Sequence, residues 1–162
     1  MKVISGVILF SALIVICCSC ALEEKKEPLV FNFETQEGRD IFNSLDNDSV
    51  YTNLIGTEKD KAEADTLYQR WLRFNRELAQ TVKANNFEWG TKDSAVILWN
   101  RIYCNGDGEV EYYLYMVRDT SVSEKTTHAF GELVKTQLPN LRYNVQREYK
   151  YAQCGSFRHY VY

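Results

Sequence analysis

The 162-residue sequence contains little of what most catalytic and metal sites are made from. It has two histidines, His128 and His159, and only Cys104 and Cys154 of its five cysteines lie beyond residue 20. Beyond residue 20 there is no Cys-x-x-Cys pair, and the sequence has no His-Glu-x-x-His run and no histidine-rich stretch. We therefore expect no metal, no cofactor and no catalytic residue, and a protein that is not an enzyme.

Concentrated positive charge is also missing. The 19 Lys and Arg residues are outnumbered by 22 Asp and Glu, which gives a formal net charge of −3, and the basic residues form no cluster. Nucleic-acid surfaces need a basic patch to neutralise phosphates. The composition therefore argues against a nucleic-acid partner.

Long apolar runs are absent beyond the first residues of the chain. Lys2 supplies one positive charge, residues 3–16 are mostly apolar, and Cys17-Cys18-Ser19-Cys20 follows. This apolar run is too short to remain as a membrane span, so residues 1–20 are typical of a removable export signal. Residues 21–28 form a polar tether, and 29–162 are long enough for a single domain.

The order of charge, short apolar run, small residue and cysteine resembles a bacterial lipoprotein signal. The resemblance implies that Cys20 is lipidated, carries palmitate-type chains and becomes the new N-terminus. Leu22, two residues later, implies the outer rather than the inner membrane. The alternative is an ordinary secretory signal cut after Ala21, which would make the protein secreted.

The pattern beyond residue 28 predicts an α+β fold, with an antiparallel sheet of three to five strands and two packed helices. A helix is expected over 57–84 and a second over 121–138, started by a capping box at Ser121. Strands are expected at 29–33, 95–104, 109–118 and in the closing segment 141–162, with a helical turn at 38–45 and a hairpin turn at 105–108. Gly155 is expected to mark a bulge. The apolar stripe of the 57–84 helix is Leu67, Trp71, Phe74, Leu78 and Val82.

One face of the expected hairpin is more apolar than the other. It carries Trp99, Tyr103 and Leu114, and we expect the 121–138 helix to cover it. Neighbouring strand residues point to opposite faces, so Tyr113 and Tyr115 belong to the other face. That second face is covered by the 57–84 helix or is left open to a partner.

The hairpin 101–110 and the closing strand from Tyr149 resemble the C-terminal domain of the TonB family, over residues 94–162. The resemblance implies a β-β-α-β order and a sheet edge that captures an extended segment of an outer-membrane receptor. The family's proline-rich spacer is absent, since the chain has only Pro28 and Pro139. What the resemblance leaves is a small module that binds peptides or proteins by strand addition.

The sequence thus predicts a non-enzymatic envelope lipoprotein that binds a protein or peptide. The closing strand is the expected edge, and the aromatic candidates for binding are Tyr113, Tyr115, Tyr149 and Tyr151. Cys104 and Cys154 are expected to form a disulfide, as is common in exported domains.

Two alternatives stay open. The first is an enzyme acting on envelope polymers, in which Cys104 or Cys154 pairs with His159. The second is a secreted carrier of a small ligand.

Overall fold

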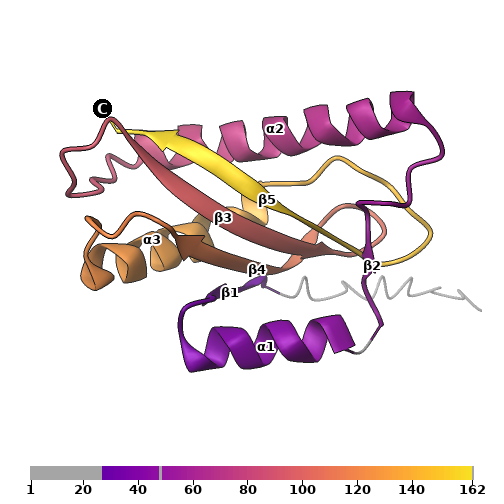
Figure 1. The fold of residues 1–162 in the computed structure, drawn as a ribbon, viewed down its shortest axis with the longest axis horizontal. Helices are drawn as coiled ribbons and strands as arrows, with labels where there is room; N and C mark the ends of the chain where they lie inside the picture. The colour runs from indigo at the N-terminus through magenta and orange to yellow at the C-terminus, as the bar shows by residue number, and fades with distance from the viewer. Residues whose placement is uncertain (1–26, 48, 162) are drawn as a thin grey trace, which may run out of the picture.

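The computed structural model describes residues 27–47 and 49–161, which form one five-stranded sheet with helices on both faces (Figure 1). The strand order is β1-β4-β3-β5-β2. The central strand β3 is antiparallel to both of its neighbours, and the two edge strands, β1 and β2, run parallel to theirs. The strands are β1 Leu29–Asn32, β2 Thr52–Asn53, β3 Ala95–Cys104, β4 Val110–Val117 and β5 Tyr151–Tyr160. The predicted α+β class with a mainly antiparallel sheet is confirmed.

The described residues contain three α-helices, one more than expected. They are α1 Gln36–Asn47, α2 Lys61–Ala84 and α3 Glu124–Gln137, and the 3₁₀ turn Leu138–Asn140 follows α3. The hydroxyl of Ser123 caps α3 by accepting a hydrogen bond from the Thr126 amide, so the expected cap at Ser121 is wrong by two residues. Ser121 instead donates its hydroxyl to Asp119 at 2.7 Å.

Helices α2 and α3 cover one face of the sheet and build the main core. All five residues of the predicted α2 stripe are buried against it, as expected for an amphipathic helix. Polar side chains also lie in this core: the Asn100 amide donates to Asn75 at 2.8 Å and to the Tyr113 hydroxyl at 3.2 Å. These hydrogen bonds compensate part of the cost of burying polar groups and join α2 to the centre of the sheet.

The opposite face is covered by α1, and here the sequence-based expectation is wrong. Trp99, Tyr103 and Leu114 do share a face, but that face meets α1 and not the 121–138 helix. Figure 1 shows α1 lying beside β1, which places it over only one side of the sheet. The contact is fixed by Arg101, which donates to Asp46 at 2.8 Å and to the Tyr103 hydroxyl at 2.9 Å.

Gly155 does not form a bulge. The β3–β5 ladder runs without a break from Ala95–Tyr160 to Cys104–Tyr151, and the irregularity lies in the β3–β4 pair, between Tyr103 and Cys104. The glycine is required for packing, since a Cβ at this position would lie 2.7 Å from the indole nitrogen of Trp71. Gly155 therefore lets α2 approach the sheet closely.

Candidate functional site

Three of the four tyrosines predicted to bind a partner are buried. Tyr113, Tyr115 and Tyr151 have almost no exposed surface, and only Tyr149 is accessible, at 41 %. The prediction is therefore wrong for Tyr113, Tyr115 and Tyr151, and it stays a prediction for Tyr149. Tyr113, Tyr115 and Tyr151 lie on the face that α2 and α3 cover, so these helices occupy the place that the prediction left for a partner.

The buried tyrosines instead connect the elements of the core. Tyr115 donates its hydroxyl to the Thr127 carbonyl in α3 at 3.0 Å, and Tyr151 donates to the Val145 carbonyl at 2.7 Å. Tyr143 reaches the Leu67 carbonyl in α2 at 3.1 Å. Burial raises the pKa of Tyr115 to about 12, so this hydroxyl stays a donor at physiological pH.

The expected disulfide between Cys104 and Cys154 is absent, and both thiols are free. Cys104 is aligned with Tyr151 across the β3–β5 ladder, whereas Cys154 is aligned with Arg101, three positions away. An odd separation also places the two side chains on opposite faces of the sheet. The fold therefore keeps the two sulfur atoms out of bonding range.

The same alternation separates the residues of the supposed Cys–His pair. Cys154 and His159 are five residues apart on β5 and point to opposite faces, and Cys104 lies at the far end of the ladder from His159. Burial raises the pKa of the Cys104 thiol, which is the reverse of what a nucleophilic cysteine needs. The pair on which the enzyme alternative depends is not formed. Cys20, the expected lipidation site, lies outside the described residues.

The most distinctive feature that remains is the outer edge of β5. The edge strand β2 pairs only with Tyr151 and Ala152, and the Leu54 amide adds one bond to the Ala152 carbonyl. From Gln153 to Tyr160 no described strand pairs with this side of β5. The expectation of a free edge on the closing strand is therefore confirmed for 153–160, an unpaired length of roughly 25 Å.

The alternation of the ladder shows which backbone groups point outwards. The Ala152 carbonyl faces β2, and in an antiparallel ladder every second residue directs both its N–H and its C=O to the same side. Cys154, Ser156, Arg158 and Tyr160 therefore present their backbone groups at the free edge. Such a row of donors and acceptors is a template for another strand.

A groove lies beside this edge. It has a volume of about 730 Å³ and is lined by the C-terminal half of α2, the connection 86–91 and the end of β5 from Phe157 to Val161. Apolar surface comes from Phe87, Trp89 and Phe157, and Arg76 stands at its rim. Arg158 points to the other face at the same edge, and neither arginine has an ion pair with a described residue. The groove therefore offers apolar contacts inside and positive charge outside.

His159 also lines the groove, packed among aromatic rings. It is 2 % exposed, its Nε2 has no hydrogen-bond partner, and its ring lies 5.7 Å from that of Trp89 and 5.6 Å from that of Phe157. Burial lowers the pKa of His159 to about 4, so the ring is neutral at physiological pH. From the sequence, His159 was expected only as a possible partner for a cysteine.

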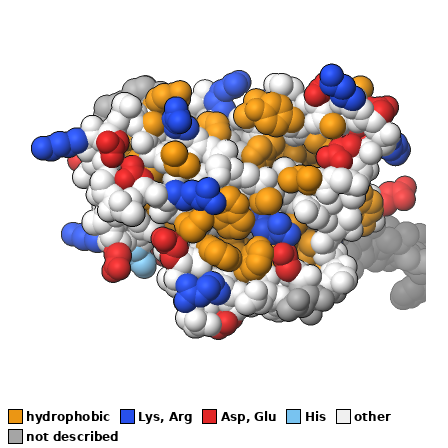
Figure 2. Space-filling view, in the orientation of Figure 1, with side chains coloured by type: hydrophobic (Ala, Val, Ile, Leu, Met, Phe, Trp, Pro, Cys, Tyr) orange, Lys and Arg blue, Asp and Glu red, His pale blue; other side chains and the backbone are white. Residues whose placement is uncertain are grey.

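An apolar patch lies on the other side of the same edge. Ile97 is 41 % and Tyr160 is 61 % exposed, and Trp99 and Met116 beside them are partly buried. Figure 2, in the view of Figure 1, shows hydrophobic side chains gathered near the middle of the molecule with basic side chains among them. The free edge of β5 is thus flanked by apolar surface on both faces of the sheet.

The sequence predicted the edge strand but did not predict that the groove residues lie together. Arg76, Trp89 and Phe157 come from three separate segments, and no periodicity in the sequence relates them. Their proximity follows from how α2 packs on the sheet.

Among residues 27–47 and 49–161, no three His, Cys, Asp or Glu side chains are grouped so that they could hold a metal ion. Over the same residues, no helix has both the length and the apolar character that a bilayer span requires.

Comparisons with protein-family models, with curated proteins and with solved structures found no match to this chain.

Proposed function

We propose that the protein is a non-enzymatic envelope module that binds an extended segment of another protein as an additional strand beside β5. The single observation that carries this proposal is the unpaired edge from Gln153 to Tyr160. Main-chain hydrogen bonds supply affinity in this mode of recognition, and pockets for alternate side chains supply specificity.

The surroundings of the edge support an added strand. Side chains of a strand next to β5 would point alternately to the two faces of the sheet. On one face they would enter the groove beside Trp89 and Phe157, and on the other they would lie next to Arg158 and Tyr160 of β5. Arg76 at the groove rim and Arg158 on the other face of β5 are both positively charged, which favours a segment that carries an acidic side chain.

The edge carries few of the features that natural proteins use to block unwanted pairing. Such features include proline, inward-pointing charges, bulges and very short edge strands. β5 has no proline, and its ladder to β3 has no bulge. Arg158 is the only charged side chain on its unpaired part, because His159 is neutral. A long edge of this kind either binds a partner or invites aggregation.

We place this module at the cell envelope, held by lipid on Cys20 and facing the periplasm or the cell exterior. The support is the lipoprotein-like order of residues 1–20, and several acyl chains would give stable anchoring. The strand-addition mode is also what the resemblance of 94–162 to the TonB C-terminal domain implies.

The test uses substitutions at Ser156, whose amide points to the free edge. The immobilised full-length protein is used to select peptides from a random display library, and selected peptides are measured against two variants. Ser156→Pro removes one edge donor and costs no ladder bond to β3, so an edge strand tolerates it. Ser156→Ala removes only the side chain and keeps the amide. We expect Ser156→Pro to weaken binding at least tenfold and Ser156→Ala to leave it unchanged.

Hydrogen exchange supplies the independent readout. Without peptide, the amides of Ser156 and Arg158 exchange quickly, whereas those of Gly155 and Phe157, which face β3, are protected. A peptide added as a strand slows exchange at Ser156 and Arg158. Selection of no peptide, equal binding by Ser156→Pro, or unchanged exchange at these two amides would each contradict the proposal.

A further inference from the structure

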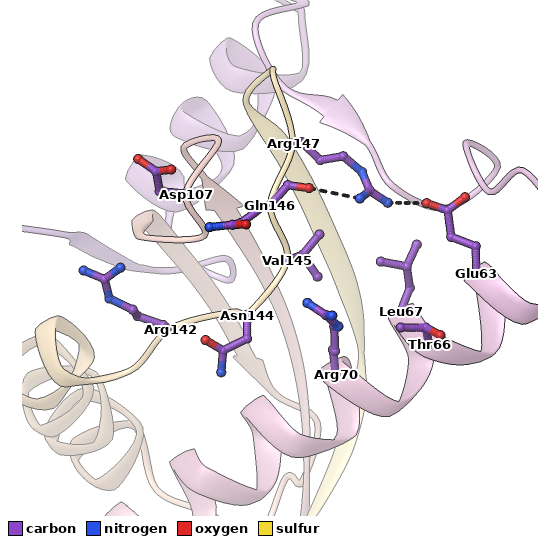
Figure 3. A pocket seen from close by; sticks show the side chains of 10 residues that line it. All are labelled: Glu63, Thr66, Leu67, Arg70, Asp107, Arg142, Asn144, Val145, Gln146 and Arg147. Carbon is purple, nitrogen blue, oxygen red and sulfur yellow. Dashed lines mark hydrogen bonds and ion pairs between the residues drawn. The ribbon is translucent and has the colours of Figure 1, made fainter.

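A second cavity lies at the other end of α2, away from the groove. It has a volume of about 460 Å³, is open to solvent, and is lined by the first half of α2, the hairpin turn at Asp107 and the segment from Arg142 to Arg147 (Figure 3). We propose that this cavity binds a small polar molecule through its carboxylate, and that Arg70 is the residue that receives the carboxylate. This proposal is independent of strand addition at β5.

The walls of the cavity are held in place by hydrogen bonds within the protein. Arg147 donates to Glu63 at 2.7 Å and its amide donates to the Gly106 carbonyl at 2.9 Å. The carbonyl of Val145 accepts from Tyr151, and that of Leu67 accepts from Tyr143. The cavity is therefore formed before any ligand arrives, as small-molecule sites usually are.

Three arginines line the cavity, and only one of them lacks a carboxylate partner among the described residues. Arg142 is paired with Glu109 at 2.6 Å and Arg147 with Glu63 at 2.7 Å. Arg70 makes no ion pair with a described residue. Figure 3 shows Arg147 turned towards Glu63, whereas Arg70 rises from α2 towards Val145. A guanidinium in this position can donate two parallel hydrogen bonds to one carboxylate.

The other lining groups indicate what surrounds the carboxylate. The side-chain amides of Asn144 and Gln146 make no hydrogen bond with a described residue and can bind hydroxyl or amide groups. Leu67 and Val145 add an apolar floor, and both are nearly fully buried. Polar groups around a small apolar surface suit a molecule the size of a sugar or a dipeptide.

The balance of charge favours a carboxylate over a phosphate. Three positive side chains, Arg70, Arg142 and Arg147, and two negative ones, Glu63 and Asp107, line the cavity, a balance of one positive charge that a single carboxylate neutralises. A phosphate group carries nearly two negative charges at neutral pH, and the carboxylates would repel it more strongly than they repel a group with one charge.

Isothermal titration of the full-length protein with defined probes tests the proposal. A carboxylate of this kind can come from a sugar acid or from the C-terminus of a peptide, so the probes are sodium glucuronate and N-acetyl-dialanine. Glucose and N-acetyl-dialanine amide are their uncharged counterparts, and inorganic phosphate is the anion control. We expect at least one acid to bind and both uncharged counterparts to fail.

The matched variants are Arg70→Gln and Arg73→Gln. Arg73 lies one turn further along α2, does not line the cavity, and is paired with Glu77 on the surface. Arg70→Gln is expected to weaken binding roughly tenfold to a hundredfold, because it removes a charge-assisted hydrogen bond. Arg73→Gln is expected to change the affinity by less than about twofold. Ser156→Pro at the β5 edge is expected to leave binding of the acid unchanged.

Three results would overturn the proposal. They are no binding of either acid up to about 10 mM, equal binding by the protein with Arg70→Gln, and binding of phosphate or of an uncharged counterpart as tight as that of the acid. Because strand addition is tested with peptides at Ser156, the two proposals can fail separately.

Discussion

Protonation of His159 is expected to make the protein less stable in mild acid. The ring is 2 % exposed and is surrounded by Trp89, Phe130 and Phe157. Its neighbours on β5, Arg158 and Tyr160, point to the other face of the sheet. The charged side chains on the groove side of the sheet are Arg76, Lys83 and Glu88. No carboxylate among the described residues is bonded to the ring, so the structure gives the imidazolium no compensation.

The size of the effect follows from the difference in pKa between the folded and unfolded chain. Burial lowers the pKa of His159 from 6.5 to about 4. The unfolded chain therefore binds the proton first, and the free energy of unfolding falls as the pH drops from about 6.5 to about 4. Linkage gives a loss of about 2 kcal/mol between pH 7.5 and pH 5, and about 3 kcal/mol by pH 4.

The measurement is urea unfolding at pH 7.5 and pH 5, followed by tryptophan fluorescence, for the native chain and for His159→Phe. The phenylalanine ring fills similar space and cannot be protonated. The carboxylates contribute equally to the pH dependence of stability in both proteins. The difference between the two pH dependences is therefore the contribution of His159. His128→Gln, at the exposed histidine of α3, serves as the control and should keep the native pH dependence. If the native chain and His159→Phe lose the same stability within about 0.5 kcal/mol, the reasoning is refuted.

Three further predictions concern groups away from the groove. Asp46→Asn leaves the buried Arg101 guanidinium without its carboxylate, and we expect it to lower the free energy of unfolding by about 1–2 kcal/mol in urea titrations. Glu77→Gln breaks the exposed ion pair with Arg73 and should lower the free energy of unfolding by less than about 0.5 kcal/mol. Equal losses of stability in the two variants would show that the burial of Arg101 is unimportant. Peptide mass spectra of the unreduced protein from its native membranes should show Cys104 and Cys154 as separate thiols. Cys104 is buried and should be alkylated only after denaturation, and a disulfide between the two cysteines would contradict the fold. The same spectra test lipid anchoring, which predicts an N-terminal peptide that begins at Cys20 and carries acyl mass.

Local patterns in the sequence were enough to locate the long elements. The α2 stripe from Leu67 to Val82 repeats at helical spacing, and the turn around Gly106 fixes the β3–β4 hairpin. These features depend on residues close to one another in the chain. That is why strand β3 falls at 95–104, where it was expected.

Local sequence patterns could not predict which helix covers which face of the sheet. Both faces of the hairpin are apolar at their centre, and the choice between them depends on α1, which was expected only as a turn. Because α1 was expected only as a turn, the face that carries Trp99 and Tyr103 was predicted to be covered by the 121–138 helix, which is α3. The buried tyrosines, the separated cysteines and the groove all depend on this arrangement, so the candidate site was predicted only as far as its edge strand.

The sheet order also has a consequence for the sequence of events in folding. β3, β4, α3 and β5 are close in the chain and can assemble first, whereas β2 joins β5 across about a hundred residues and contributes only a two-residue ladder. We therefore expect β2 to dock late and to detach first in local opening, when the rest of the sheet is still intact. The length of β5 that is open to a partner would then vary with time, because the segment that limits it is the most weakly held strand of the sheet.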